Sequence, residues 1–133
     1  MITHISTTTV YISDQDKALD FYVNKLGFEK RRDEPMGPGA PRWIEVAPQG
    51  AQSALVLYKP TKEMPGASTF ELAQSLIGTF TTFVLNIDDM QKTFNELKEK
   101  GVEFPNPPEK QFYGWWATIK DTDGNIIGLH SNL

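Results

Sequence analysis

Residues 120–130 read KDTDGNIIGLH, a cluster of turn-forming residues followed by a short apolar strand. The segment DTDGN (121–125) favours the left-handed and side-chain-capped conformations of a tight turn, which predicts a hairpin into the last strand. Side chains alternate along a strand, so Ile127 and Leu129 are expected to pack inward. The opposite face then carries Ile126, Gly128 and His130. Gly128 is unusual there, because the interior of a strand has no local need for glycine.

Composition limits the classes of function that the 133-residue chain can have. The formal net charge is −4 without a basic block, which argues against nucleic acid as a partner. The chain has no cysteine, so disulfides, thiolate nucleophiles and cysteine-ligated metals are excluded. No apolar run reaches the roughly 20 residues that span a bilayer, and the N-terminus does not resemble a secretion signal. We therefore expect a cytoplasmic protein with a small-molecule partner and no membrane partner.

The first half of the chain predicts the element order βαβββ. A strand is expected over 7–12, and a helix over 15–26 carries an apolar stripe. Asp14 stands at the N-cap of this helix, and Gly27 stands where a C′ glycine is common. Three further strands and a loop rich in proline and glycine complete the half: strands 28–32, 43–46 and 54–58, and loop 33–41.

The second half predicts the same order after a short connecting helix. A capping box at Ser68–Glu71 begins that connecting helix, which is expected to end near Gly78. A strand over 82–87 is followed by Asp88-Asp89 as helix caps. The remaining expected elements are helix 90–100, strands 102–104, 115–119 and 126–130, and loop 105–114.

Matching positions in the two halves indicate an internal duplication. Ile12-Ser13-Asp14 corresponds to Ile87-Asp88-Asp89, and Gly27-Phe28-Glu29 corresponds to Gly101-Val102-Glu103. A single small sheet covers one face with its own helix and needs the sister module for the other face. The predicted fold class is therefore α+β, with two βαβββ modules whose curved mixed sheets form a cup. The expected boundaries within one domain (1–133) are 1–62 for the first module, 63–78 for the connector helix and 79–133 for the second module.

Three stretches resemble the vicinal oxygen chelate superfamily, which includes glyoxalase I, extradiol dioxygenases, fosfomycin-resistance proteins and bleomycin-binding proteins. They are VYISDQDKALDFYVNKLGFE (10–29), NIDDMQKTFNELKEKGVEF (86–104) and DTDGNIIGL (121–129). The resemblance covers nearly the whole chain. It implies paired βαβββ modules, often assembled as a homodimer, that form a cup for a small ligand.

Metal-dependent members of that superfamily hold a divalent ion with four side chains, usually histidines or carboxylates. Carried over to this sequence, those four positions fall on Thr7, Val56, Thr82 and Gly128. Two threonines, a valine and a glycine are poor ligands for a hard divalent ion. We therefore expect no metal and no other cofactor. A displaced metal site built from His4, Glu45 and His130 is the alternative.

The face of the sheets opposite the helices is expected to carry an aromatic lining with a few polar groups. Such a lining suits a flat or partly apolar small molecule. The expected ligand-binding residues are Thr7, Thr9, Tyr11, Trp43, Glu45, Val56, Tyr58, Thr82, Asn86, Tyr113, Trp116, Gly128 and His130. Val84 and Thr118 are expected on the same face. The sequence leaves open whether Trp115 or Trp116 points to the cavity.

Two functions fit these residues. The first is a metal-free binding protein for a small aromatic or hydrophobic molecule, as in the bleomycin-binding branch. The second is a lyase, isomerase or dioxygenase that uses a displaced metal or acid–base residues, with Glu45, His130 and Tyr11 as candidates. Glu45 could instead be neutralised in a surface ion pair by Arg42 or a lysine. A fold shared by many functions does not choose between them, although the four vacant metal positions favour binding.

Overall fold

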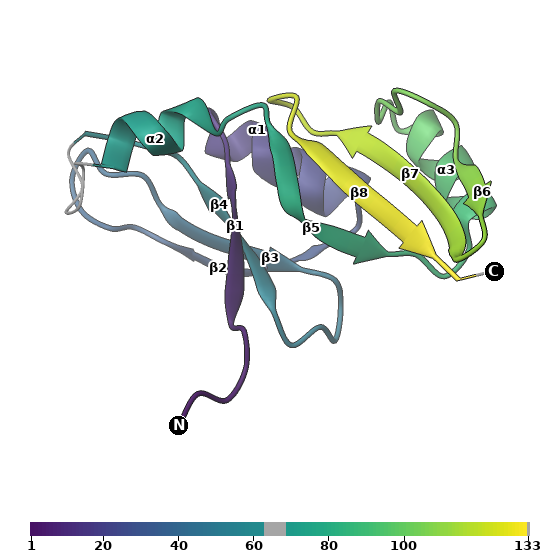
Figure 1. The fold of residues 1–133 in the computed structure, drawn as a ribbon. Coiled ribbons are helices and arrows are strands. Elements are labelled where there is room, and N and C mark those ends of the chain that lie inside the picture. The colour runs from purple at the N-terminus through teal and green to yellow at the C-terminus, as the bar shows by residue number, and fades with distance from the viewer. Residues whose placement is uncertain (63–68, 133) are drawn as a thin grey trace. The chain divides into compact units, whose positions relative to one another are not determined.

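The computed structural model describes residues 1–62 and 69–132, and the chain divides into two compact units. Unit 1 is Met1–Ile77 and unit 2 is Gly78–Leu133. Each unit contains a four-stranded mixed sheet (Figure 1), and in both sheets the first strand of the unit lies next to the fourth, followed by the third and the second. The identical order confirms the predicted α+β class with two βαβββ modules.

In unit 1 the helices and strands follow the order that the sequence predicts, but their boundaries differ. The elements are β1 (Thr7–Tyr11), α1 (Gln15–Leu19), the π-helix η1 (Asp20–Lys25), β2 (Glu29–Glu34), β3 (Trp43–Ala47), β4 (Ala54–Tyr58) and α2 (Phe70–Ser75). Strand β1 runs parallel to β4, and the β2–β3 and β3–β4 pairs are antiparallel.

The two faces of the unit 1 sheet differ in what covers them. Helix α1 and η1 pack on one face, where Ile12, Ile44 and Tyr22 are fully buried. Residues directly paired across the sheet share a face, so the register Thr9↔Val56, Tyr11↔Tyr58 and Glu45↔Val56 defines the other face. Trp43 lies on that face too, two residues before Glu45.

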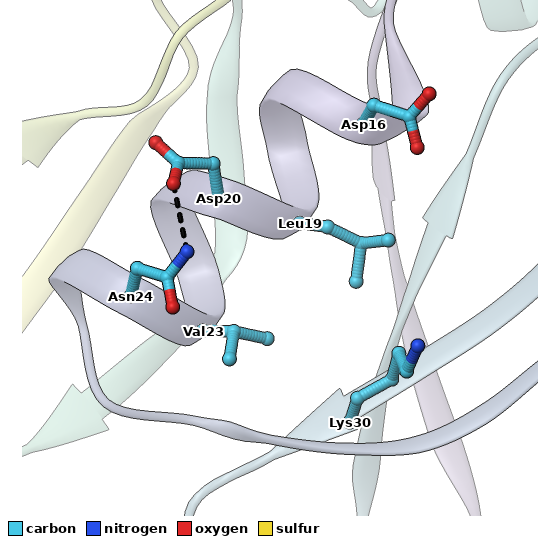
Figure 2. A pocket seen from close by; sticks show the side chains of 6 residues that line it. All are labelled: Asp16, Leu19, Asp20, Val23, Asn24 and Lys30. Carbon is cyan, nitrogen blue, oxygen red and sulfur yellow. Dashed lines mark hydrogen bonds between the residues drawn. The ribbon is translucent and has the colours of Figure 1, made fainter.

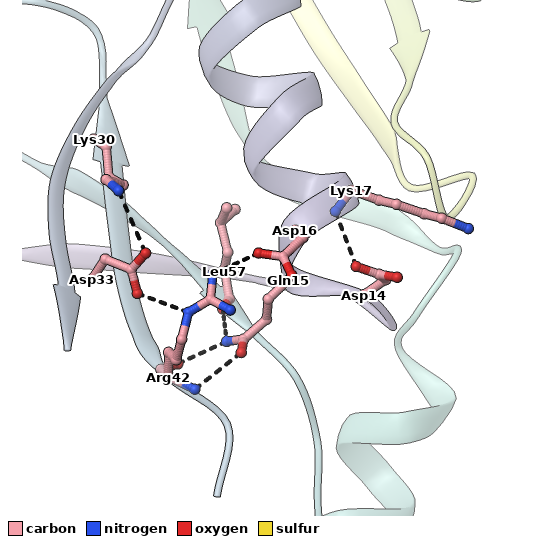
Figure 3. Close-up of polar contacts among 8 residues, drawn as sticks. All are labelled: Asp14, Gln15, Asp16, Lys17, Lys30, Asp33, Arg42 and Leu57. Carbon is pink, nitrogen blue, oxygen red and sulfur yellow. Dashed lines mark hydrogen bonds and ion pairs between the residues drawn. The ribbon is translucent and has the colours of Figure 1, made fainter. Parts of the chain in front are cut away.

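Side-chain hydrogen bonds fix helix α1 to the sheet (Figure 3). The Asp14 carboxylate accepts from the backbone N–H of Lys17 at 3.0 Å, which caps the helix as predicted. The buried Gln15 amide donates to the carbonyls of Arg42 and Leu57 and accepts from the backbone N–H of Arg42. The Arg42 guanidinium bonds Asp33 and Asp16, each at 2.9 Å. These hydrogen bonds raise the pKa of Arg42, and the one to Asp16 has the larger effect.

Unit 2 repeats this plan and ends on the predicted hairpin. Its elements are β5 (Phe80–Asn86), α3 (Met90–Glu99), β6 (Glu109–Gln111), β7 (Gly114–Lys120) and β8 (Ile126–Ser131). Helix α3 covers one face of the sheet (Figure 1), where Ile127 and Leu129 are buried as predicted. In the turn, the Asp121 carboxylate accepts from the backbone N–H groups of Asp123 and Asn125, and Gly124 has a φ of 81°.

Several predicted boundaries are wrong. The helix expected over 15–26 becomes π-helical from Asp20, because the N–H of Leu26 bonds the carbonyl of Phe21. Strand β2 extends to Glu34, into the expected loop 33–41. The stretch 102–104 forms one isolated bridge rather than a strand, and the second strand of unit 2 is instead β6, inside the expected loop 105–114.

The connecting helix also differs from its prediction. Ser68, the expected first residue of the capping box, lies outside the described residues. Thr69 is the N-cap of α2, and its side chain makes no cap hydrogen bond. Helix α2 ends at Ser75, before Gly78. No helix in the described part of the chain is both long and apolar enough to span a membrane.

Candidate functional site

A cavity of about 250 Å³ lies on the face of the unit 1 sheet opposite α1. Neighbouring strands supply most of its lining, and helix α2 supplies the rest. The described residues around it are Thr9, Tyr11, Trp43, Val56, Tyr58, Thr69 and Ala73. Five of these seven are residues that the sequence predicts to bind a ligand, while the two from the segment around α2 were not predicted. The sequence carries no signal for these two residues, because only the structure shows that Ala73 is buried while its neighbours Leu72 and Gln74 are exposed.

Aromatic rings make up the largest part of this lining. The rings of Tyr11 and Tyr58 lie 5.8 Å apart between centroids, with an angle of 82° between their planes. The β3–β4 register places Trp43 next to Tyr58 on the same face. Val56, two residues before Tyr58 on β4, adds an aliphatic surface to the lining. A planar or apolar molecule could therefore contact ring faces on more than one side.

Glu45 lies on the same face as the cavity but is not among the residues that line it. Its Oε2 accepts a hydrogen bond from the indole Nε1 of Trp43 at 2.7 Å. Its ion-pair partner is Arg32, at 3.4 Å from Nη1 to Oε2. The expectation that Arg42 or a lysine neutralises Glu45 is therefore wrong, because the β2–β3 register, with its bulge between Lys30 and Arg32, places Arg32 opposite Glu45.

Arg32 also contacts Glu34 on its own strand. Its Nη2 lies 2.8 Å from Oε2 of Glu34, and this hydrogen bond is the main cause that raises the pKa of Arg32. Arg32 is thus shared between two carboxylates, which leaves the group of Arg32, Glu34 and Glu45 with one net negative charge. Glu34 pairs with Trp43 across the β2–β3 ladder. Both carboxylates therefore stand beside the indole of the cavity.

The second group of predicted site residues lies in unit 2. The pairs Trp116↔His130, Thr118↔Gly128, Val84↔Gly128 and Asn86↔His130 place these six residues on the sheet face opposite α3. This register answers the open question, because Trp116 lies on that face and Trp115 on the other. Tyr113 stacks on His130 with 5.9 Å between ring centroids.

Gly128 is explained by the ring that covers it. A Cβ at this position would lie 2.4 Å from Cη2 of Trp116, so the indole occupies the space of any side chain there. Thr82 lies on β5 and is exposed, and Thr7 lies on β1 and is half-buried.

These positions do not fit the divalent ion of metal-dependent superfamily members. Val56 offers only hydrocarbon, and Gly128 has neither a donor nor room for one. Within either unit, no three His, Asp or Glu side chains among residues 1–62 and 69–132 gather closely enough to hold a metal. Of the alternative ligands, His4 hydrogen-bonds Thr3 at the exposed N-terminus, and Glu45 bonds Trp43 and Arg32.

A second hollow, lined by Asp16, Leu19, Asp20, Val23, Asn24 and Lys30, lies along α1 and η1 (Figure 2). Its polar side chains already have partners. Asn24 donates to Asp20 at 2.7 Å, and Lys30 pairs with Asp33. The hollow combines two apolar side chains with satisfied polar groups, so it lacks the convergent polar atoms of a ligand site.

Comparisons with known proteins agree with this fold. The family model described as Glyoxalase/Bleomycin resistance protein/Dioxygenase superfamily matches residues 2–129. The Bacillus subtilis protein YetH is 38% identical over 129 residues, which cover 97% of this chain and 98% of YetH.

Two crystal structures are similar along nearly their whole length. A superfamily member from Sphaerobacter thermophilus is 36% identical, with a TM-score of 0.84 and coverage of 98% of both chains. TnmS3, an antibiotic binding protein from Streptomyces sp. CB03234, is 34% identical with a TM-score of 0.78, covering 99% of this chain and 98% of TnmS3.

Proposed function

Because this chain belongs to the Glyoxalase/Bleomycin resistance protein/Dioxygenase superfamily, we propose that it binds a small aromatic or hydrophobic molecule in the cavity of unit 1 without a metal ion. The observation that carries the proposal is the lining itself. Three aromatic side chains and Val56 converge on one concave space from three neighbouring strands. Drug-sized ligands occupy pockets of about 300–1,000 Å³. A cavity of about 250 Å³ suits a smaller ligand of one or two rings.

The similarity to TnmS3 supports binding rather than catalysis. TnmS3 is an antibiotic binding protein, and at 34% identity over nearly the whole chain it shares more than the fold. The catalytic alternative needs a base that can reach a substrate. Glu45, the strongest candidate, already shares Oε2 between the Trp43 indole and Arg32. These contacts favour a supporting role for Glu45.

Blocking the cavity tests the binding site. Ala73→Leu on α2 adds a large side chain to the lining, whereas Gln74→Leu adds one to the exposed side of the same helix. We expect members of a panel of neutral and charged one- and two-ring aromatic compounds to raise the melting temperature, because a ligand of the native state stabilises it. Ala73→Leu should abolish this shift and Gln74→Leu should keep it. A panel without a single stabilising compound, or a shift unaffected by Ala73→Leu, would overturn the proposed site.

Elemental analysis tests the absence of a metal. The purified protein is expected to contain no stoichiometric Zn, Mn, Ni or Fe, and none of these ions should raise its melting temperature. The donor chemistry at Val56 and Gly128 supports this expectation. A stoichiometric metal that stabilises the protein would refute the metal-free part of the proposal and leave the cavity to be tested by Ala73→Leu.

We also propose a homodimer, as the superfamily resemblance implies. Sedimentation equilibrium should then give a mass twice the 15.0 kDa of one chain. A mass of one chain at all concentrations tested would refute the dimer.

A further inference from the structure

We infer that the unit 1 cavity is an aromatic cage that selects a cationic ligand of the quaternary ammonium class over a neutral ligand of the same shape. This inference rests on the proposed function and adds the charge of the ligand to it. It depends on three features of the described residues: the angles between the rings, the charges beside them and the absence of a positive charge in the described lining.

The ring geometry provides walls at right angles. Tyr11 and Tyr58 are nearly perpendicular, at 82°, with centroids 5.8 Å apart. Trp43 adds a third ring from the adjacent strand β3. The face of each ring carries the negative part of its quadrupole, and a cation within about 6 Å of a ring centroid is attracted to it. Several such rings around one space are the arrangement that recognises methylated ammonium groups.

The charges next to the cavity reinforce this preference. The indole N–H of Trp43 donates to the Glu45 carboxylate at 2.7 Å, so negative charge lies at the edge of one cage wall. A hydrogen bond to an ionised acceptor is strong and polarises its donor, which makes the indole a better partner for a cation. Arg32 offsets part of this charge, but it is divided between Glu45 and Glu34. The group of three keeps one net negative charge.

No lysine or arginine is among the described lining residues. Arg32, beside Glu45, is paired with two carboxylates, and two lysines near the cavity lie beyond its lining. The ammonium of Lys62 sits over the Phe70 ring, 5.4 Å from its centroid, and Phe70 does not line the cavity. Lys59 follows Tyr58 at the end of β4 and is exposed to solvent. An anionic ligand would therefore meet aromatic rings without a compensating charge in the described lining, and Glu45 lies just behind one of those rings.

A matched pair of probes isolates the charge. Phenyltrimethylammonium and tert-butylbenzene have nearly the same shape, and only the first is charged. Their dissociation constants can be measured by quenching of tryptophan fluorescence, with chemical-shift changes at Ala73 as a second readout. We expect phenyltrimethylammonium to bind about tenfold more tightly. Equal binding, or tighter binding of tert-butylbenzene, would overturn the cage and leave the proposed binding function standing. If no compound of the aromatic panel binds either, the proposed function itself fails.

Charge variants separate the cage from simple packing. Glu45→Gln keeps an acceptor for the Trp43 indole and removes the charge. It should therefore weaken the binding of phenyltrimethylammonium several-fold and leave the binding of tert-butylbenzene unchanged. Arg32→Gln removes the opposing positive charge and should strengthen the binding of phenyltrimethylammonium. Glu29→Gln, which removes an exposed carboxylate from the same sheet, is the matched control and should change neither. If Glu45→Gln weakened the binding of both probes equally, the electrostatic role would be refuted, because Glu45 would then only position Trp43.

Discussion

At the scale of single residues, Gly128 shows how one position carries both structural and functional information. The resemblance to the superfamily implies that it stands at the position of a metal ligand. In the structure the same place lies under the indole of Trp116, 2.4 Å from where a Cβ would stand. The glycine therefore allows the ring to lie against strand β8, and the ring in turn excludes a ligand side chain.

Gly128→Ala should destabilise the protein, because the new methyl group forces the Trp116 ring away from β8. Overpacking of this kind costs about 1–3 kcal/mol, and the free energy of unfolding in urea should fall by that amount. The tryptophan fluorescence of the native state should change as well. The double variant Gly128→Ala/Trp116→Ala removes the clash, so its stability should equal that of Trp116→Ala alone. Stability of Gly128→Ala equal to that of the original protein would contradict this account.

The sequence could predict which residues share a face, but not which of them are partners. Period-two alternation correctly placed Trp43, Glu45 and Val56 on one face, since alternation follows from strand geometry. The partner of Glu45 depends on the β2–β3 register and on the bulge between Lys30 and Arg32, which leaves no hydrophobic pattern in the sequence. In the same way, a one-residue choice between Trp115 and Trp116 needed the β7–β8 register.

At the scale of elements, the two helix starts show the duplication in atomic detail. The Asp14 carboxylate accepts from the backbone N–H of Lys17, and the Asp89 carboxylate accepts from that of Lys92 at 3.1 Å. This bond to Lys17 is the main cause that lowers the pKa of Asp14 below 3.8. The caps were readable from the sequence because they depend on one local residue and three backbone positions.

The contribution of the Asp14 cap to stability should depend on pH. Because the pKa of Asp14 is lower in the folded chain than in the unfolded chain, its stabilisation is present above pH 3.8 and is lost as pH falls through the folded pKa. Asp14→Ala should therefore lower the melting temperature at pH 7 and have a much smaller effect near pH 2. Melting curves of both proteins at the two pH values provide the measurement. An effect of the same size at both values would show that the charge of Asp14 does not act.

Gln15 fixes the start of helix α1 to two strands. Its amide is buried and makes three hydrogen bonds, to the backbone of Arg42 and to the carbonyl of Leu57. Gln15→Leu would leave these backbone groups without their partner, which costs about 1–3 kcal/mol for each buried group left unsatisfied. Urea unfolding should show a loss of at least that size. Gln91→Leu on the exposed side of α3 is the control, and we expect a change within about 0.5 kcal/mol.

Apolar periodicity could not predict two elements, strand β6 and the π-helix η1. Strand β6 consists of Glu109, Lys110 and Gln111, and only backbone pairing with β7 makes it a strand. The π-helix η1 carries the same apolar residues as an α-helix would, so hydrophobic spacing cannot distinguish the two. Its wider turn accompanies the burial of both Phe21 and Tyr22, which are adjacent in sequence.

At the scale of the whole molecule, the chain consists of two copies of one plan with different surfaces opposite their helices. In unit 1 that face holds the cavity, and part of it is covered by α2. In unit 2 the described elements contain no helix on that face, which carries Trp116, Thr118 and His130. Val84 on the same face is 53% exposed. A small four-stranded module in which its own helix covers only one face of the sheet is marginal by itself.

Residues 78–133 made as a separate polypeptide should therefore be less stable than the same residues in the full chain. We expect its unfolding midpoint in urea to be lower, and we expect it to increase the fluorescence of 1-anilinonaphthalene-8-sulfonate, which binds exposed apolar surface. Val84→Ser in this polypeptide should reduce the dye signal, whereas Gln91→Ser on the exposed side of α3 should not. A monomer that unfolds at the midpoint of the full chain without binding dye would show that this face needs no cover. The sheet face opposite α3 would then be available for a ligand without any need for a covering partner. Unit 2 would then be a module that is stable alone.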